Sequence, residues 1–464
     1  MTSGLAADLF AIGVAAPCEA RCSAKRRGGG PLPAGEVRVS DSRVKQRGAS
    51  ALTVVLLLIL GVVVVAGVGV VLQARGRLDE AKRRWALEVA PLEEIAARYP
   101  DREANQAALD LDERAARLGI GQVPKDASRP QVETTLPERV ALKEWLAQQL
   151  ASASSVTSAP PEGVRAWLAE HEAQILSLAN AVLAGEAPRW ESHLKPDIAI
   201  PNLFGHLTLQ RTLSAAGLEA ALADRPAVAV RLVEASWRLN DELFRRPELI
   251  SRLIAVAAAR DTAGLLRKLP SVPAEWEERL VSLDLRALIR ESLEFEAWYM
   301  SDYPRRRAEN VTDEEEPREE VIDRWFGGPF FKLDMADHLD RLRQLLGSEA
   351  MAGRCPVDRR AVGALPEYHW WRDLATDGGT DLSASLVRGD RLQVDLELTR
   401  QVLRARRLRS PEKALGSCDQ WSYVTEVGPD GNLRVRFEGQ APEAPQTGLV
   451  LPLEWMEDSA GASP

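Results

Sequence analysis

The sequence predicts a mainly α-helical protein with a single transmembrane helix, an antiparallel helical array and a small C-terminal β-hairpin element. An uncharged apolar run, Ala51–Leu72, is long enough to cross a bilayer. Apolar residues then recur every three or four positions through most of the chain, as in amphipathic helices. Near the C-terminus the apolar period changes to two, which is typical of strands. Phe and Tyr, with 8 and 5 copies in 464 residues, are scarce, which also favours helix over sheet.

We expect five segments. They are a disordered N-terminal tail over 1–48, a transmembrane helix over 51–73, juxtamembrane helices and a linker over 74–135, the helical array over 136–410, and a β-hairpin element with a flexible C-terminus over 411–464. The tail is rich in Gly and Pro and has no periodicity, which is typical of disorder. A start at Val44 is the alternative, because it would give a compact positive-then-apolar anchor.

The apolar run predicts an uncleaved membrane anchor. Its 22 residues span roughly 33 Å as a helix, against a hydrocarbon core of about 30 Å. A cleavable signal peptide has a shorter apolar region and a small-residue cleavage site. Basic residues follow this run instead, namely Arg75, Arg77, Lys82, Arg83 and Arg84. The lipid bilayer is therefore an expected partner, through residues 51–73.

Charge is distributed unevenly along the chain. The first 50 residues hold eight Lys/Arg and four Asp/Glu, whereas the residues after the apolar run hold 51 basic and 64 acidic side chains. An acidic body argues against nucleic-acid binding, which needs a basic surface. Both flanks of the anchor are basic, but long acidic domains do cross membranes. We expect a bacterial inner-membrane protein with a cytoplasmic N-terminus and a periplasmic body.

Pro and Gly residues divide the body into successive helical patterns. These patterns cover 74–90, 91–99, 101–119, 136–150, 161–185, 201–225, 226–246, 247–269, 273–283, 285–303, 333–353 and 390–408. Short connections between such helices predict antiparallel neighbours. Gly327 and Gly328 before Pro329 indicate a turn.

The patterns over 201–225 and 226–246 resemble a tetratricopeptide hairpin. Small and apolar residues fall at that repeat's packing positions, namely Leu213, Ala216, Gly217, Ala220, Ala229, Val233 and Ser236. The resemblance covers one unit of about 34 residues and does not recur at the next period. It implies a helix-pair scaffold with no particular ligand.

Near the C-terminus, residues 421–437 alternate around Pro429–Asn432, which predicts a β-hairpin. The stretch "TGLVLPLEW", residues 447–455, could add a third strand.

Motifs for catalysis, cofactor binding and metal binding are absent from the sequence. The five histidines form no HxxxH or HExxH pair, and Cys18 and Cys22 are a lone CxxxC without further zinc ligands nearby. No GxSxG or GxxxxGK[ST] occurs. We therefore expect no enzymatic activity, no cofactor and no metal site.

Three features offer more specific hypotheses. His369, Trp370 and Trp371 in "EYHWWRD" could form an aromatic surface for a partner. Cys355 and Cys418 could form a disulfide if the body is exported. Glu291 and Glu294 share a helix face, and paired carboxylates in a cleft are what a carbohydrate-active hydrolase would use.

Two resemblances to known families follow from quoted stretches. "PLEEIAARYPDREANQAALDLDERAARLGI", "IPNLFGHLTLQRTL", "EASWRLNDELFRRPELISRLIAVA" and "LLRKLP" resemble an uncharacterised family of bacterial single-pass membrane proteins, over most of residues 85–270. This resemblance implies a helical extracytoplasmic body and brings no activity. "QRGASALTVVLLL" is similar to the anchor of the K-type minor pseudopilin of type II secretion, with Thr53 and Val54 matching. That similarity implies cleavage after Gly48, although the anchor departs from the family's pattern over 49–51.

The sequence thus favours a membrane-anchored helical scaffold or partner-binding protein of the bacterial cell envelope, which would dock a protein or peptide in its helix grooves. A carbohydrate-active envelope hydrolase and a pseudopilin-like secretion subunit are the two alternatives. Nothing in the sequence identifies a small-molecule ligand.

Overall fold

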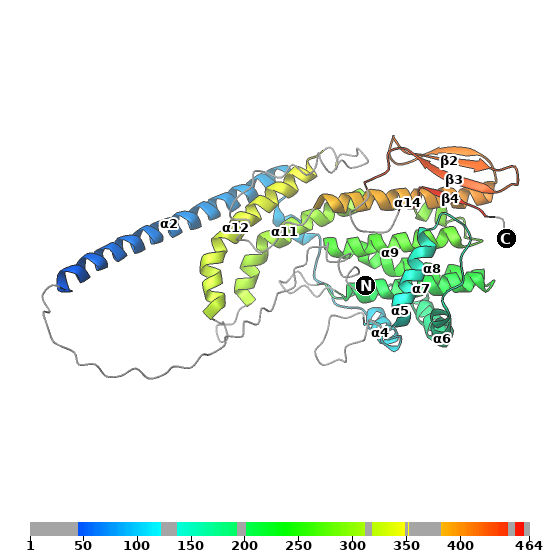
Figure 1. The fold of residues 1–464 in the computed structure, drawn as a ribbon, viewed down its shortest axis with the longest axis horizontal. Coiled ribbons are helices and arrows are strands. Elements are labelled where there is room, and N and C mark those ends of the chain that lie inside the picture. Colours follow the sequence, from blue (N-terminus) through cyan, green and yellow to red (C-terminus); the bar gives the residue numbers. More distant parts are fainter. Residues whose placement is uncertain are drawn as a thin grey trace, which may run out of the picture. The chain divides into compact units, whose positions relative to one another are not determined.

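The computed structural model describes residues 45–121, 137–192, 201–310, 318–348, 351, 382–443 and 451–458. Within these ranges the chain is mainly helical and ends in a small antiparallel sheet, which confirms the predicted fold class (Figure 1). The chain divides into two compact units. The first unit comprises 1–83, 315–337 and 368–380, and the second comprises 84–314, 338–367 and 381–464.

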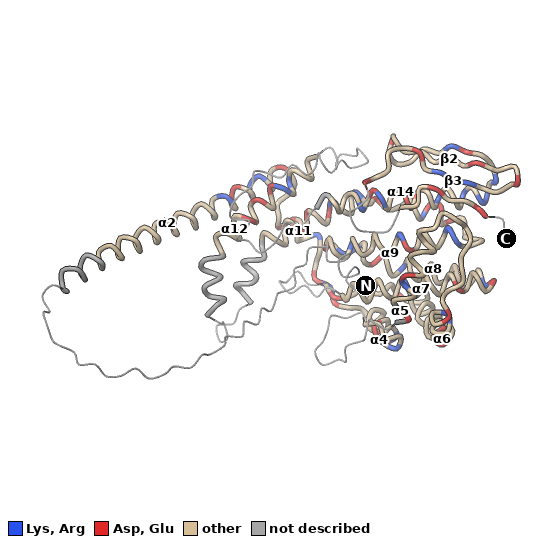
Figure 2. The backbone as a smooth tube through the Cα atoms, in the orientation of Figure 1, with Lys and Arg blue, Asp and Glu red and all other residues tan. Residues whose placement is uncertain are grey.

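The first unit contains most of helix α2, Lys45–Glu88, and the first part of helix α12, Arg318–Leu346. Side chains from Thr53 to Gly69 are exposed, and the apolar stretch has a mean hydropathy of 3.2. Figure 2 shows α2 without charged residues along this stretch and with many after it. The helix is long and apolar enough to span a membrane. Beyond that stretch, Ala74 packs against Leu333 and Phe330 of α12.

The predicted turn at Gly327–Pro329 is wrong, because α12 continues through Pro329 as a helix. A proline ring usually clashes with the Cβ of the residue before it. Gly328 has no Cβ, so this part of the clash is removed. Gly328, one of the two glycines that suggested a turn, therefore lowers part of the steric cost of a proline inside the helix.

The second unit contains the helical body. Its helices are α3 Leu92–Ala97, α4 Gln106–Arg117, α5 Pro137–Ala151, α6 Glu162–Ala184, α7 Leu203–Leu222, α8 Pro226–Arg245, α9 Leu249–Lys268, α10 Trp276–Arg279, α11 Leu285–Asn310 and α14 Leu382–Leu408. Asn202 caps α7 by accepting a hydrogen bond from the Gly205 amide at 3.0 Å. Gly119, with φ of 69°, follows the end of α4, as a C′ glycine does.

Helix α4 begins five residues later than the pattern starting at Asp101 predicts. Asn105 is its N-cap and accepts a hydrogen bond from the Ala108 amide at 3.0 Å. Before that cap, Arg102 exchanges two backbone hydrogen bonds with Ser192, at 2.8 and 2.9 Å. This long-range pairing holds the preceding residues extended.

Helices α7, α8 and α9 contact one another and form the centre of the larger core (Figure 1). Helix α14 packs on α9 and also on strands β2 and β3. It therefore needs two apolar faces. Leu392, Leu396 and Leu403 join the helical core. Val394, Leu398 and Val402 join a second core beneath the sheet.

The sheet has the order β1-β2-β3-β4 and is antiparallel throughout. Its strands are β1 Glu412–Leu415, β2 Ser422–Val427, β3 Leu433–Glu438 and β4 Glu454–Met456. The predicted hairpin is β2–β3, and β4 lies at the end of the suggested third strand. Sequence reasoning missed β1, because its four residues show no apolar alternation.

Arg406 connects α14, α9 and the sheet. Its guanidinium lies over the Trp455 ring, 4.6 Å from the ring centroid. It also donates hydrogen bonds to the carbonyls of Arg267 and Leu269, both at 2.6 Å, near the C-terminal end of α9. These carbonyls have no partner within their own helix, so Arg406 caps α9 while it supports the sheet.

Candidate functional site

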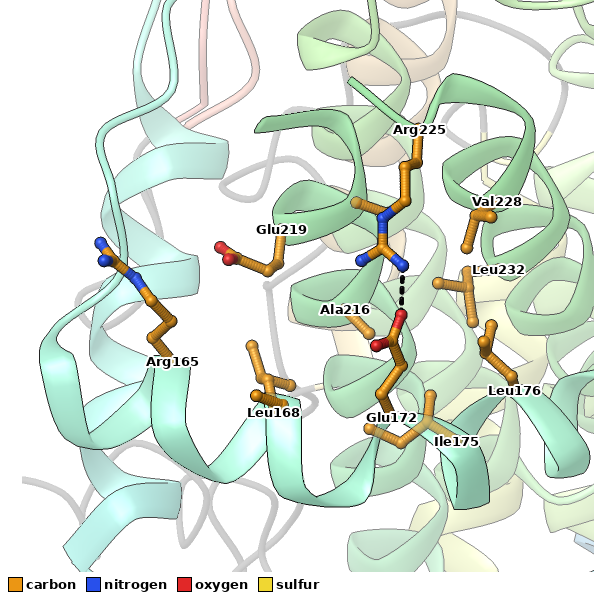
Figure 3. A pocket seen from close by; sticks show the side chains of 12 residues that line it. Arg165, Leu168, Glu172, Ile175, Leu176, Ala216, Glu219, Arg225, Val228 and Leu232 are labelled. Atoms are coloured by element: carbon orange, nitrogen blue, oxygen red, sulfur yellow. Dashed lines mark hydrogen bonds and ion pairs between the residues drawn. The ribbon is translucent and has the colours of Figure 1, made fainter. Parts of the chain in front are cut away.

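A groove opens between helices α6, α7 and α8, and we call it the α6–α8 groove (Figure 3). Its volume is about 470 Å³, which includes solvent space at its open mouth. Its lining is mostly apolar, with charged side chains at the sides, and comprises Arg165, Leu168, Ala169, Glu172, Ile175, Leu176, Ala216, Glu219, Ala220, Arg225, Val228 and Leu232. An apolar depression with a few charged groups is the usual form of a binding site.

Small residues on α7 shape this groove. Ala216 and Ala220 line it, and larger side chains at these positions would occupy its space. Gly217 points toward α9 instead, because a Cβ at this position would lie 3.2 Å from Leu265 Cδ2. The tetratricopeptide-like positions therefore serve two purposes, which are close packing on α9 and an open space beside α6.

The charged side chains of the groove differ in how they are paired. Arg225, in the loop between α7 and α8, forms an ion pair with Glu172 of α6 (Figure 3). Arg165 and Glu219 form no ion pair with any residue that the structure describes. The groove thus offers one unpaired cation and one unpaired anion beside an apolar floor.

A second depression, of about 660 Å³, lies beside α4 and the end of α6. Its charged lining residues are both acidic, Asp110 and Glu186, and Asp110 accepts a hydrogen bond from Gln106 Nε2 at 2.7 Å. It lacks the opposite charges of the α6–α8 groove, so we take that groove as the candidate site.

Most of the site residues suggested by the sequence lie outside the described residues. These are His369, Trp370, Trp371 and Cys355. Cys418 is described. It is buried beneath the sheet, 3% exposed, and is disulfide-bonded. The predicted bond between Cys355 and Cys418 stays a prediction, since Cys18, Cys22 and Cys355 all lie outside the described residues.

The paired carboxylates of α11 are bonded to arginines. Glu291 accepts a hydrogen bond from Arg252 at 2.9 Å. Glu294 accepts one from Arg98 at 2.8 Å and also contacts Arg290. The hydrolase hypothesis required two acids converging in a cleft, and neither carboxylate lines the two depressions described above.

Two histidines and two glutamates of the body have pKa values shifted by burial. His206 packs edge-on against Trp190. Burial lowers the pKa of His206 and the pKa of His338, each to about 4. Burial raises the pKa of Glu242 and of Glu296 to about 7. Sequence reasoning did not single out these two acids, because nothing in local spacing marks a glutamate for burial. Among the described residues, no group of three His, Cys, Asp or Glu side chains could hold a metal ion.

Within the described residues, the fold and the groove define a class of protein: a helical body with a mostly apolar surface groove, on a chain that also has one helix of membrane-spanning length. Comparisons of the chain with protein-family models, with curated proteins and with solved structures find no match.

Proposed function

We propose that this protein is a membrane-anchored helical scaffold of the bacterial cell envelope that docks a segment of a partner protein in the α6–α8 groove. The observation that carries the proposal is the groove itself, with its apolar floor and its unpaired Arg165 and Glu219. The apolar, membrane-length stretch of α2 supports the anchor. A disulfide at Cys418 supports an oxidising compartment for the body, such as the periplasm.

The groove suits an amphipathic peptide segment. Apolar side chains of such a segment would contact Leu168, Ile175 and Leu232 on the floor, and burial of apolar surface would supply most of the affinity. An acidic and a basic group of the segment would pair with Arg165 and Glu219. Charges at the rim mainly fix orientation and partner choice.

The test compares two groove variants with two control variants of the tagged, full-length chain in its host cells. Arg165→Glu with Glu219→Lys reverses the unpaired charges, and Ala216→Trp fills the groove. Arg231→Glu on α8 and Glu170→Lys on α6 are the controls, because both residues are exposed on helices that form the groove but do not line it.

We expect one cross-linked partner to be recovered with the unmodified chain and with both controls. Its recovery should fall about tenfold or more in the groove variants, as loss of central interface contacts costs at least ~1.4 kcal/mol. Equal recovery of the same partner from groove variants and controls would refute docking at this groove.

A further inference from the structure

The end of the apolar stretch fixes the depth of the first unit relative to a bilayer. Leu72 is the last residue of that stretch, and Ala74 follows two residues later. Two residues of helix rise about 3 Å. The headgroup layer on each side of the hydrocarbon core is roughly 5–7 Å thick. When α2 spans a membrane, Ala74 therefore lies within the headgroup layer.

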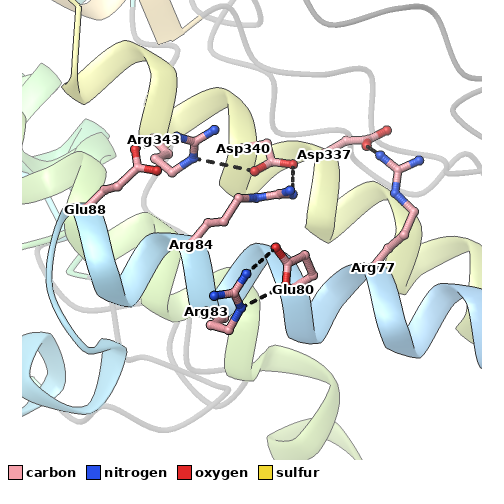
Figure 4. Close-up of polar contacts among 8 residues, drawn as sticks. All are labelled: Arg77, Glu80, Arg83, Arg84, Glu88, Asp337, Asp340 and Arg343. Atoms are coloured by element: carbon pink, nitrogen blue, oxygen red, sulfur yellow. Dashed lines mark hydrogen bonds and ion pairs between the residues drawn. The ribbon is translucent and has the colours of Figure 1, made fainter.

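Helix α12 comes to the same depth. Phe330 and Leu333 pack against Ala74. Arg77 Nη2, farther along α2, contacts Asp337 Oδ1 at 3.2 Å (Figure 4). Because both contacts advance toward the C-terminus, the two helices run in the same direction.

The turn of α12 at this depth has the chemistry of a membrane interface. We call Gly328–Lys332, with sequence "GPFFK", the interfacial segment. All five residues are partly exposed, whereas Leu333, Met335 and Ala336 just after them are buried. Aromatic rings are favoured at the headgroup level, and a lysine there extends its ammonium toward lipid phosphates. In sequence, the aromatic character continues upstream with Trp325 and Phe326.

We propose that the interfacial segment of α12 binds the headgroup layer of the membrane that α2 spans, so that the protein contacts lipid through two helices. This inference rests on the proposed membrane anchor and is independent of the α6–α8 groove. Phe330 and Phe331 would insert among the upper acyl carbons, and Lys332 would pair with anionic headgroups. A second contact restricts rotation and tilt of the anchor, because interfacial residues set helix orientation in a bilayer.

The test is photo-cross-linking of the full chain reconstituted in vesicles of phosphatidylcholine and phosphatidylglycerol. Phe331 is replaced by p-benzoylphenylalanine, with Lys332 replaced in the same way as a second reporter. Phe204 is the matched control, because it is a phenylalanine of α7 that is 55% exposed and far from α2 in sequence. Leu60, inside the apolar stretch and 57% exposed, is the positive control.

We expect lipid adducts, measured by mass spectrometry, at Leu60, Phe331 and Lys332, with yields about fivefold or more above that at Phe204, as an interfacial location requires. Adducts at Leu60 with yields at Phe331 and Lys332 no higher than at Phe204 would overturn the interfacial segment alone. Absence of adducts at all sites, including Leu60, would overturn the membrane anchor and this inference together.

Discussion

Glu242 is a charged residue placed where charge is costly. It lies on α8 and is 7% exposed. Burial raises the pKa of its carboxyl to about 7, although Arg246, Arg245 and other nearby guanidinium groups act in the opposite direction. Because the folded-state pKa lies above the ordinary value of 4.5, the folded protein binds a proton that the unfolded chain releases first. Stability contributed by this proton is complete below about pH 4.5 and is lost as the pH rises through about 7.

We expect Glu242→Gln to flatten the dependence of unfolding free energy on pH between 4.5 and 7. At pH 8 the variant should be more stable than the unmodified protein by up to about 3 kcal/mol, and the difference should vanish near pH 4.5. Chemical denaturation across this pH range measures the effect, with the exposed Glu170→Gln as control. A pH profile unchanged by Glu242→Gln would show that Glu242 titrates normally in the folded protein.

At the scale of the helices, two ion pairs connect the end of α2 with α12, and both lie within the second unit (Figure 4). Arg84 Nη2 lies 2.8 Å from Asp340 Oδ2, and Glu88 pairs with Arg343. Asp340 is also 3.6 Å from Arg343. Single surface ion pairs contribute little, but Asp340 is only 16% exposed and bridges two arginines. These contacts therefore specify which helix the end of α2 accompanies.

Exchanging the charges of Arg84 and Asp340 tests whether this ion pair specifies the pairing of α2 with α12. We expect Arg84→Asp and Asp340→Arg to lower the unfolding free energy by about 1–2 kcal/mol each, because each leaves like charges facing one another. The double variant should recover most of the loss. Arg83→Asp is the control, since Arg83 forms its ion pair with Glu80 of its own helix. This substitution should cost a few tenths of a kcal/mol. Additive losses in the double variant would contradict a direct Arg84–Asp340 interaction.

At the scale of the whole molecule, Cys418 beneath the small sheet is disulfide-bonded, and the other three cysteines of the chain all lie far from it in sequence. We predict Cys355 as its partner, because both cysteines lie on the same side of the apolar run. Peptide mapping without reduction should recover the two cysteines joined. Cys418→Ser should then destabilise the protein by about 2–5 kcal/mol, since the bond closes a long loop.

Recovery of Cys418 joined to Cys18 or Cys22 would contradict this pairing. It would also contradict the predicted topology, because both tail cysteines precede the apolar run. Cys355→Ser serves as the matched variant. Equal destabilisation by the two single substitutions, with no further loss in the double variant, is the result expected for bonded partners.

Features that depend on short stretches of chain could be predicted from the sequence. The apolar run Ala51–Leu72 shows its membrane length directly, because helix rise and the absence of charge need no tertiary information. Other predictable features depend on backbone conformations that individual residues prefer. They are Pro226 at the start of α8, Gly119 after α4 and the hairpin turn at Pro429–Asn432.

Only the tertiary structure decided the site and the buried charges. Ala216 and Ala220 fit a helix-pair pattern, but they line a groove only because α6 lies opposite them. Sequence spacing singled out Glu291 and Glu294. The glutamates whose pKa values are raised by burial are instead Glu242 and Glu296. Burial could not be predicted, because it depends on which helix faces pack against one another. Phe330 reaches the level of Ala74 through a contact between segments about 250 residues apart. Such contacts are set by the packing of whole helices, and no local pattern in the sequence encodes them.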